Sequence, residues 1–140
     1  MRRTKGVLLL LTAALLFSAC KSGAEEVDKV EPMSKKAVAD TGFYRLTLTD
    51  KAIERLDVQT AEVTQQNSTL AMPYGALLYD LNGDTWVYVN VEPNVFVRQS
   101  VMVDVIRNDQ VVLRDGPEAG TKVVSVAAAE LYGAETGIGK

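Results

Sequence analysis

The 140-residue chain has the length of about one domain, and its 47% hydrophobic and 24% charged residues are typical of a foldable globular protein. It contains no His and a single Cys, which excludes His-based catalytic triads, His-containing zinc sites and Cys-pair redox motifs. The formal net charge of −3 and the pI near 5.0 argue against a nucleic-acid-binding protein, because phosphate binding needs a surplus of Lys and Arg on one face.

The N-terminal residues have the pattern of an export signal. Arg2, Arg3 and Lys5 precede an apolar stretch over residues 7–17. This stretch is too short for a membrane-spanning helix, which needs about 20 apolar residues. We therefore predict a signal peptide over residues 1–19.

The single Cys follows this apolar stretch. Residues 16–19 read LFSA, and small residues directly before Cys20 resemble the bacterial lipobox, which usually has Leu where Phe17 stands. A thiol is needed to carry the diacylglycerol, and two or three acyl chains give durable anchoring that one chain does not. We predict that Cys20 is lipidated and holds the protein to a membrane with its body in the periplasm. The alternative is a chance Cys beside an ordinary secretory cleavage site.

The segment after Cys20 has the composition of a tether. Residues 21–42 contain nine charged residues of both signs, Pro32 and no aromatic residue, so we predict a flexible linker. Without the signal peptide the chain has 12 basic and 18 acidic residues, a net charge of −6. The acyl chains, and not electrostatic attraction, must therefore hold it to an anionic bilayer. Lys21 leaves the choice between inner and outer membrane open.

The folded domain is predicted over residues 43–140, and its pattern has mostly a period of two. Residues 44–48 alternate between apolar and polar, which predicts a half-buried strand. Residues 50–56 follow as a short helix with Ile53 and Leu56 on one face. The further predicted strands comprise residues 57–63, 76–79, 85–91, 95–99, 101–106, 110–114 and 121–127.

The connections between these strands predict the fold class. Residues 64–68 read as a polar loop, while Asn82-Gly83 and Asn108-Asp109 mark two hairpins. Residues 128–132 are predicted as a helical turn or coil and residues 133–140 as a loose tail. Short strands at this spacing predict a mainly β protein, a small antiparallel β-roll or barrel with one short helix over an open end.

Two segments resemble a known family. Residues 43–63 read FYRLTLTDKAIERLDVQTAEV, and residues 72–78 and 85–89 read MPYGALL and TWVYV, with GPEAGTKVV at residues 116–124. These segments are similar, in this order, to the N- and C-terminal parts of the membrane-proximal domain of periplasmic adaptor subunits, or membrane fusion proteins, of RND-type efflux pumps. Pro117 stands where that family commonly has Leu.

One departure from the family limits what the resemblance implies. Family members insert further barrel strands, a lipoyl-like domain and usually a long helical hairpin between the two parts, whereas this chain has only residues 64–68 there. The resemblance therefore implies a lipid-anchored accessory or regulatory subunit that binds an inner-membrane exporter or its full-length adaptor. The alternative is an independent envelope lipoprotein that binds a small ligand or another envelope protein.

The candidate sites favour binding over catalysis, and we expect no cofactor. Asp80 to Asp84 has the look of a calcium loop, but its spacing lacks the Gly and Glu positions of an EF-hand, so a hairpin turn is predicted. The other groups considered have ordinary structural interpretations as core, linker or solvated surface; they are Met33, Met72 and Met102, and the carboxylates Asp104, Glu130 and Glu135.

Two pairs of residues share a strand face. Trp86 and Tyr88 lie on one predicted face, and core packing explains them best. Phe96 and Arg98 lie on another. Core packing or a cross-strand pair is the first interpretation of Phe96 as well, and a partner-binding patch is the alternative, for which Phe96 and Arg98 are the first candidates. The sequence predicts no catalytic residue, and it leaves the transported substrate and the oligomeric state open.

Overall fold

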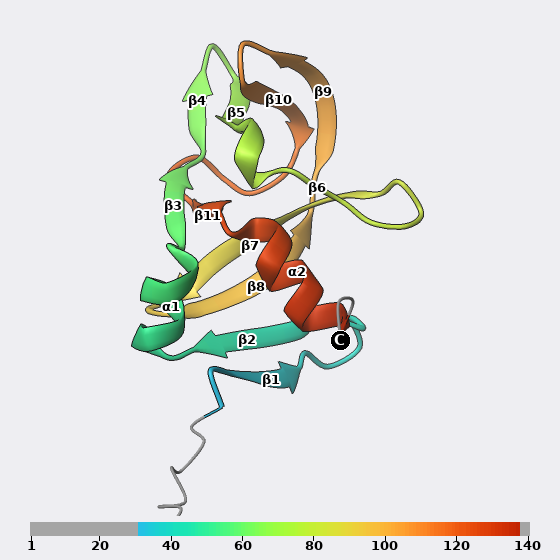
Figure 1. Cartoon of the computed structure of the whole chain (residues 1–140). Coiled ribbons are helices and arrows are strands. Elements are labelled where there is room, and N and C mark those ends of the chain that lie inside the picture. The colour runs from blue at the N-terminus through green and yellow to red at the C-terminus, as the bar shows by residue number, and fades with distance from the viewer. Residues whose placement is uncertain (1–30, 138–140) are drawn as a thin grey trace, which may run out of the picture.

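The computed structural model describes residues 31–137, so the predicted signal peptide and Cys20 lie outside the described residues. The mainly β fold is confirmed (Figure 1). In chain order the elements are β1 (Met33–Ala37), β2 (Tyr44–Leu48), α1 (Asp50–Leu56), β3 (Gln59–Glu62), β4 (Thr64–Gln66), β5 (Thr69–Pro73), the 3-10 turn η1 (Tyr74–Ala76), β6 (Leu78–Tyr79), β7 (Thr85–Glu92), β8 (Val95–Ser100), β9 (Met102–Arg107), β10 (Gln110–Asp115), β11 (Lys122–Val126) and α2 (Ala128–Thr136).

The strands form two antiparallel sheets. The larger has the order β1-β2-β8-β7-β11-β3, with β6 paired to β7, and the smaller has the order β4-β5-β10-β9. We call the larger sheet with α1 and α2 the lower lobe, and the smaller sheet with η1 the upper lobe, as they appear in Figure 1. Val63 alone joins β3 to β4, and Val101 alone joins β8 to β9. At both places the chain passes from the larger sheet directly into the smaller one.

Each lobe has its own hydrophobic core, because β7 and β11 face a different core on each side. Tyr88 and Val124 point into the lower core, while their neighbours Val87 and Val123 point into the upper core. This is the alternation expected of a strand buried on both faces. The lower core is made of Leu46, Leu48, Ala52, Leu78, Tyr88, Phe96, Val124, Ala128 and Leu131. The upper core is made of Val63, Met72, Ala76, Leu77, Val87, Val101, Val111, Leu113 and Val123.

The helix α1 forms as its sequence predicts. The hydroxyl oxygen of Thr49 accepts a hydrogen bond from the backbone N–H of Ala52 at 3.1 Å, which caps the helix at its N-terminus. Asp50 lies in the first turn, where the helix dipole favours a negative charge. Asp57 ends the helix in a left-handed conformation.

The predicted tether is wrong over part of its length. Residues Met33–Ala37 form β1, an edge strand that pairs with β2 from Met33 opposite Leu48 to Ala37 opposite Tyr44. Met33 packs against the lower core. Composition predicted a linker because β1 is polar, but charged side chains such as Lys35 and Lys36 are typical of an edge strand.

The predicted loop at residues 64–68 is a hairpin. Thr64–Gln66 forms β4 and pairs with β5, and Asn67 and Ser68, both with positive φ, make the two-residue turn between them. Two central residues with φ > 0 are the requirement of a type I′ turn. The polar residues that led to the prediction of a loop belong to β4, which lies at the edge of the smaller sheet.

The C-terminal region is helical over a longer range than predicted. The helix α2 continues through Gly133 to Thr136, so residues 133–136 are not a loose tail, and residues 31–137 contain two α-helices where one was expected. Leu131 and Glu135, four residues apart, both face the protein interior. Gly137 ends the helix at a φ of 76°.

Candidate functional site

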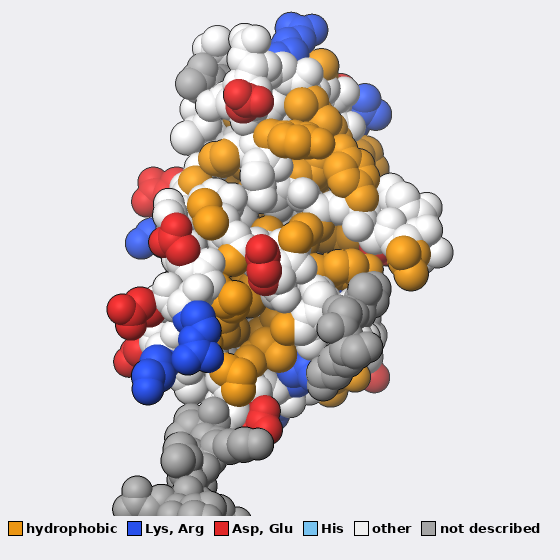
Figure 2. All heavy atoms as spheres, viewed as in Figure 1, with side chains coloured by type: hydrophobic (Ala, Val, Ile, Leu, Met, Phe, Trp, Pro, Cys, Tyr) orange, Lys and Arg blue, Asp and Glu red, His pale blue; other side chains and the backbone are white. Residues whose placement is uncertain are grey.

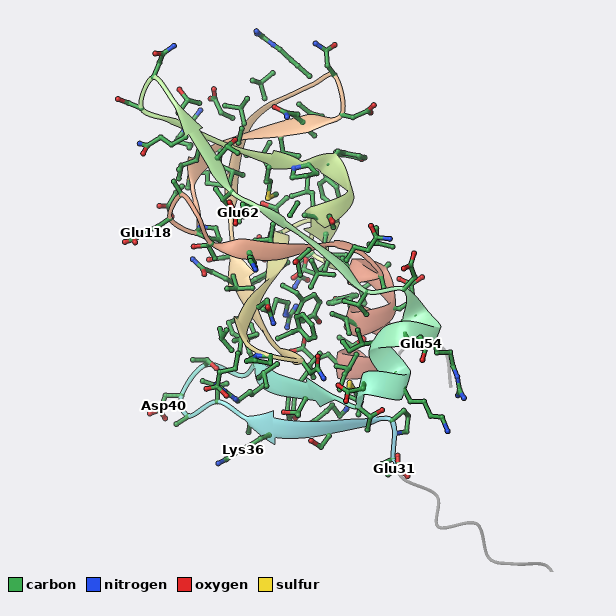
Figure 3. All side chains as sticks on the ribbon, turned by 90° about the vertical axis from the view of Figure 1, so that its left-hand side faces the viewer. Glu31, Lys36, Asp40, Glu54, Glu62 and Glu118 are labelled. Carbon is green, nitrogen blue, oxygen red and sulfur yellow. The ribbon has the colours of Figure 1, made fainter. Side chains whose placement is uncertain are left out.

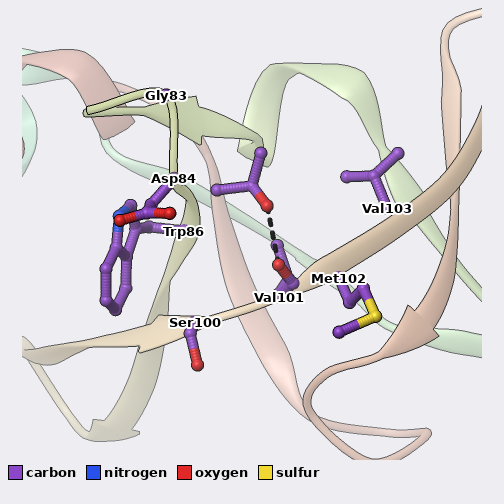
Figure 4. Close-up of a pocket in the computed structure, with 8 residues that line it drawn as sticks. Gly83, Asp84, Trp86, Ser100, Val101, Met102 and Val103 are labelled. Carbon is purple, nitrogen blue, oxygen red and sulfur yellow. Dashed lines mark hydrogen bonds between the residues drawn. The ribbon is translucent and has the colours of Figure 1, made fainter. Parts of the chain in front are cut away.

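An open cleft of about 600 Å³ lies where the two lobes meet on one side of the molecule (Figure 4). The loop between β6 and β7 forms one wall with Asp84, and the passage from β8 into β9 forms the other with Ser100 and Met102. The hydroxyl of Thr85 donates a hydrogen bond to the carbonyl of Val101 at 2.6 Å and joins the two walls.

The loop from Asp80 to Asp84 is closed by one carboxylate. Asp80 Oδ1 accepts hydrogen bonds from the backbone N–H groups of Asn82 and Asp84 at 2.8 and 3.0 Å. Its Oδ2 accepts one from the indole Nε1–H of Trp86 at 3.1 Å. The predicted hairpin connection is confirmed as a five-residue loop, with β6 paired to β7 on either side.

The charge state of Asp80 follows from these contacts. Desolvation works to raise the pKa of Asp80, but the hydrogen bonds from Asn82, Asp84 and Trp86 outweigh it and hold that pKa below its ordinary value. Asp80 is therefore ionised at neutral pH, and both of its oxygens are engaged within the loop.

Behind Trp86, a guanidinium group is enclosed by aromatic rings. Arg98 Cζ lies 4.8 Å from the ring centroids of Phe43 and Trp86 and 5.4 Å from that of Tyr132. The Arg98 side chain is only 11% exposed. Cation–π attraction strengthens when the cation is desolvated in this way, so Arg98 and the indole of Trp86 hold one another in place.

The counter-charge of Arg98 comes from α2. Glu135 Oε2 lies 3.3 Å from Arg98 Nε and accepts a hydrogen bond from the hydroxyl of Tyr88. Glu135 Oε1 accepts a hydrogen bond from the backbone N–H of Tyr44 at 3.2 Å. Arg98 Nε makes no hydrogen bond of good geometry, so its attraction to Glu135 is mainly electrostatic.

Burial shifts the titration of Tyr88. Burial, then the hydrogen bond and the negative charge of Glu135, raise the pKa of Tyr88 above its ordinary value. The tyrosine therefore stays a neutral donor at all moderate pH values. At the same end of α2, Lys35 Nζ donates to the carbonyl oxygens of Glu135 and Ala134 at 3.0 and 3.4 Å, which is where a helix favours a cation.

These contacts form one continuous structure from the cleft to α2. Trp86 forms part of the cleft wall, stacks on Arg98 and is oriented by Asp80, while Arg98 is held by Glu135. The arrangement gives the cleft a wall whose side chain is fixed before any ligand arrives, which lowers the entropy cost of binding. The lining of the cleft is mixed, with polar side chains at Asp84 and Ser100 and apolar ones at Trp86 and Met102.

The structure places the predicted contact residues inside the protein. Phe96 and Arg98 share a strand face as expected, but Phe96 is buried in the lower core and Arg98 lies under the aromatic rings. Neither has the exposed side chain that a direct contact requires, although contact with a partner itself stays a prediction. The core packing predicted for Trp86 and Tyr88 is confirmed.

Among the carboxylates considered earlier, the prediction for Glu135 is wrong, because that side chain is 2% exposed. Glu130 and Asp104 are exposed as predicted, and Asp104 pairs with Arg114 at 3.0 Å. Figure 3 shows other carboxylates, among them Asp40, Glu54 and Glu118, on separate elements around the outside of the molecule. Leu131 lies four positions earlier, on the same face of α2, and is buried. Its apolar side chain is the sequence feature from which the burial of Glu135 could have been inferred.

The methionines lie in three different surroundings. Met72 is buried in the upper core, Met33 packs on the lower core and Met102 is exposed. Residues 31–137 contain no group of three or more His, Cys, Asp or Glu side chains arranged to hold a metal ion. In the same part of the chain, neither helix has the length and apolar character needed to cross a bilayer.

Comparisons of the chain with protein-family models, curated proteins and solved structures found no match.

Proposed function

We propose that this protein is a lipid-anchored binding module of the cell envelope that acts as an accessory or regulatory subunit of an inner-membrane exporter. The proposal combines the lipobox-like sequence before Cys20 with the resemblance of two segments to the membrane-proximal domain of efflux adaptors. Its partner is the exporter or the full-length adaptor that rests on it.

One observation carries most of the weight: the two resembling segments share a sheet. β2 and β3 come from the first segment, and β7 and β11 come from the second. β3 pairs directly with β11, with Ala61 opposite Val123. A domain built from both segments thus closes on itself without the large insertion of adaptors, and the Asn67-Ser68 turn stands at that position. This supports a role confined to the membrane-proximal level.

The first described strand also supports action close to a membrane. Because β1 begins at Met33, only 12 residues separate Cys20 from the folded domain. Twelve residues reach about 40 Å when fully extended and about 20 Å as a flexible coil. A domain held this closely meets the periplasmic surface of proteins in the same membrane.

Crosslinking in cells tests the proposal. The wild-type protein should capture an exporter or full-length adaptor that mass spectrometry identifies. Cys20→Ser should lose lipid labelling, leave the membrane fraction and capture less of that partner. Capture of no transport component by the lipidated protein, with Cys20→Ser still membrane-bound after a salt wash, would contradict both parts of the proposal.

The cleft favours a second candidate, an independent envelope lipoprotein that binds a small ligand. The volume of this open cleft, about 600 Å³, lies within the range of small-molecule sites. Deletion of the gene separates the two candidates. Loss of an exporter subunit should change cellular resistance to an exported compound, whereas loss of a free-standing binding protein should leave resistance unchanged.

A further inference from the structure

β1 lies at the outer edge of the larger sheet and buries little of its side-chain surface. Four of its five residues are exposed, and Met33 packs against the lower core. Figure 2 shows hydrophobic side chains gathered between α1 and α2 on the lower lobe, and Met33 is the residue that β1 adds to this core. Segments with few buried apolar contacts and exposed backbone hydrogen bonds open at a lower free energy than the core does. β1 therefore has the character of a segment that opens before the lower lobe unfolds.

The backbone bonds of β1 come from alternate residues. Val38 N–H, directly after the strand, donates to the carbonyl of Phe43 at 2.9 Å. In an antiparallel pair, successive residues turn their N–H groups to opposite edges of the strand, so the N–H of Lys36 also faces β2, where Arg45 lies opposite. The N–H of Ala37 faces away from β2. Neighbouring residues thus differ in whether their N–H holds β1 in the sheet.

The Lys35 side chain ties β1 to the last turn of α2. Its Nζ donates hydrogen bonds to the carbonyl oxygens of Glu135 and Ala134 at 3.0 and 3.4 Å. The side chain of Glu135 starts from the same turn, and its Oε2 lies 3.3 Å from Arg98 Nε. Arg98 Cζ in turn lies 4.8 Å from the ring centroid of Trp86. One line of contacts therefore leads from β1 through α2 to a side chain of the cleft wall.

The connection after β1 supplies a second and shorter line. Phe43 is held at its carbonyl by Val38 N–H at 2.9 Å and at its N–H by the hydroxyl oxygen of Thr41 at 3.2 Å. Its ring meets that of Trp86 edge-on, with centroids 5.1 Å apart and an interplanar angle of 68°. The centroid of the same ring lies 4.8 Å from Arg98 Cζ. A displacement of β1 therefore also displaces a ring that packs directly on Trp86.

Trp86 is where the two lines meet, and its indole is restrained from two sides. Asp80 of the β6–β7 loop accepts the hydrogen bond from Nε1–H at 3.1 Å. On the other side, the edge-on ring of Phe43 and the guanidinium of Arg98 hold the indole by aromatic and cation–π attraction. The first restraint belongs to the loop, while the second depends on β1. With β1 detached, the indole keeps Asp80 and loses part of the packing that fixes its orientation.

We propose that β1 is a detachable strap whose docking on β2 and α2 fixes Trp86 in the cleft wall, so that its release loosens the cleft while both cores stay folded. Such coupling is reciprocal, because whatever orders Trp86 in the cleft also favours the docked strap. All the contacts that carry it lie within residues 31–137, so it holds whether or not the proposed function is correct.

Two proline variants of the full-length protein test the release of the strap. Lys36→Pro removes an N–H that faces β2, whereas Ala37→Pro, the matched control, removes one that faces solvent, where an edge strand tolerates Pro. Lys36→Pro should speed hydrogen exchange at the β1-facing amides of Arg45 and Thr49 by at least about tenfold. It should also shift the fluorescence of Trp86, the only Trp in the chain, to longer wavelength. Ala37→Pro should leave both measurements close to those of the wild type.

Exchange at the amides of β10 shows whether the rest of the domain stays folded, since β10 lies in the upper lobe. Fast exchange at Arg45 and Thr49, slow exchange in β10 and a shifted Trp86 emission support the strap. Faster exchange of all these amides together would overturn it, because β1 would then open only with the whole domain. Equal results for the two proline variants, or an opened β1 with an unmoved Trp86 emission, would overturn it as well.

Two lysine variants test the line of contacts through α2. Lys35→Met keeps the aliphatic stem but removes the cation that binds the last turn of α2. Lys36→Met is the matched control, because Lys36 points away from the sheet in Figure 3. Lys35→Met should make Trp86 more accessible to quenching by acrylamide, and Lys36→Met should not. Identical quenching in the two variants would contradict the coupling through α2.

Discussion

The two cores of this small domain are built on different principles. Among residues 31–137, the upper core consists of aliphatic side chains and Met72, without a charged side chain. The lower core contains Tyr88 and Phe96, and the ion pair of Arg98 with Glu135 lies at its side. An aliphatic core tolerates rearrangement that keeps its volume, whereas a buried ion pair fixes one arrangement and is costly when half of it is removed. The lower lobe should therefore be the more sensitive to single polar changes.

The largest effect is expected at Glu135. Replacing Glu135 with Ala leaves Arg98 buried without a counter-charge and Tyr88 without its acceptor, which should lower the free energy of unfolding by about 3–5 kcal/mol. Urea unfolding measures it. Glu130→Ala on the exposed side of the same helix should change the value by less than about 0.5 kcal/mol. Equal losses for the two variants would refute the difference between the cores.

The matching change in the upper core is Met72→Ala. Met72 is almost fully buried among aliphatic side chains, and its truncation should cost about 2–5 kcal/mol through lost burial and a cavity. Met72→Leu, which keeps the volume, should cost less than about 1.5 kcal/mol. The comparison fails if Met72→Leu is as destabilising as Met72→Ala.

A smaller and pH-dependent effect is expected at Tyr88. Tyr88→Phe removes one donor to Glu135 and should cost about 1–3 kcal/mol at neutral pH. Because the folded pKa of Tyr88 is raised above its ordinary value of 10.0, its contribution is fully present below pH 10 and is lost as the pH rises further. The wild-type protein should thus lose stability in strong alkali more steeply than Tyr88→Phe. If the free energy of unfolding falls equally with pH above 10 in the two proteins, Tyr88 is not the source of the loss.

The smallest effect is expected at Asp80, because its contacts lie within one exposed loop. Asp80→Ala should leave global unfolding nearly unchanged but alter the fluorescence of Trp86, the only Trp in the chain. The folded pKa of Asp80 is lowered, so its contribution is present above about pH 3.8 and is lost as the pH falls below that value. An acid-dependent fluorescence change below about pH 3.8 that persists in Asp80→Ala would rule out Asp80 as its source.

Elements with local signals were predictable from sequence. The α1 helix has its cap at Thr49 and its acidic first turn at Asp50, and both act through neighbouring backbone groups. Most of the outer strands alternate between apolar and polar residues because only one of their faces is buried, so apolar period two located them. The β6–β7 hairpin followed from Asn82-Gly83 in the same way.

Elements that depend on distant partners were not predictable. β1 is a strand because β2 offers a free edge eleven residues later, and nothing in its own polar sequence shows this. Glu135 is buried because Arg98 and Tyr88, 37 and 47 residues earlier, supply its charge partner and donor. The contact residues were misplaced for the same reason: Arg98 reads as a surface cation until Phe43, Trp86 and Tyr132 are seen around it.

The single-residue passage from β8 to β9 has a mechanical consequence. β1 is hydrogen-bonded to β2, β2 to β8, and β8 continues through Val101 into β9. A pull between the N-terminal end of β1 and the outer strand of the upper lobe is thus carried by two hydrogen-bonded ladders and one covalent segment. Tension applied at the N-terminal end of β1 would be borne first by the five residue pairs of the β1–β2 ladder, which makes β1 the force-sensitive element of the domain.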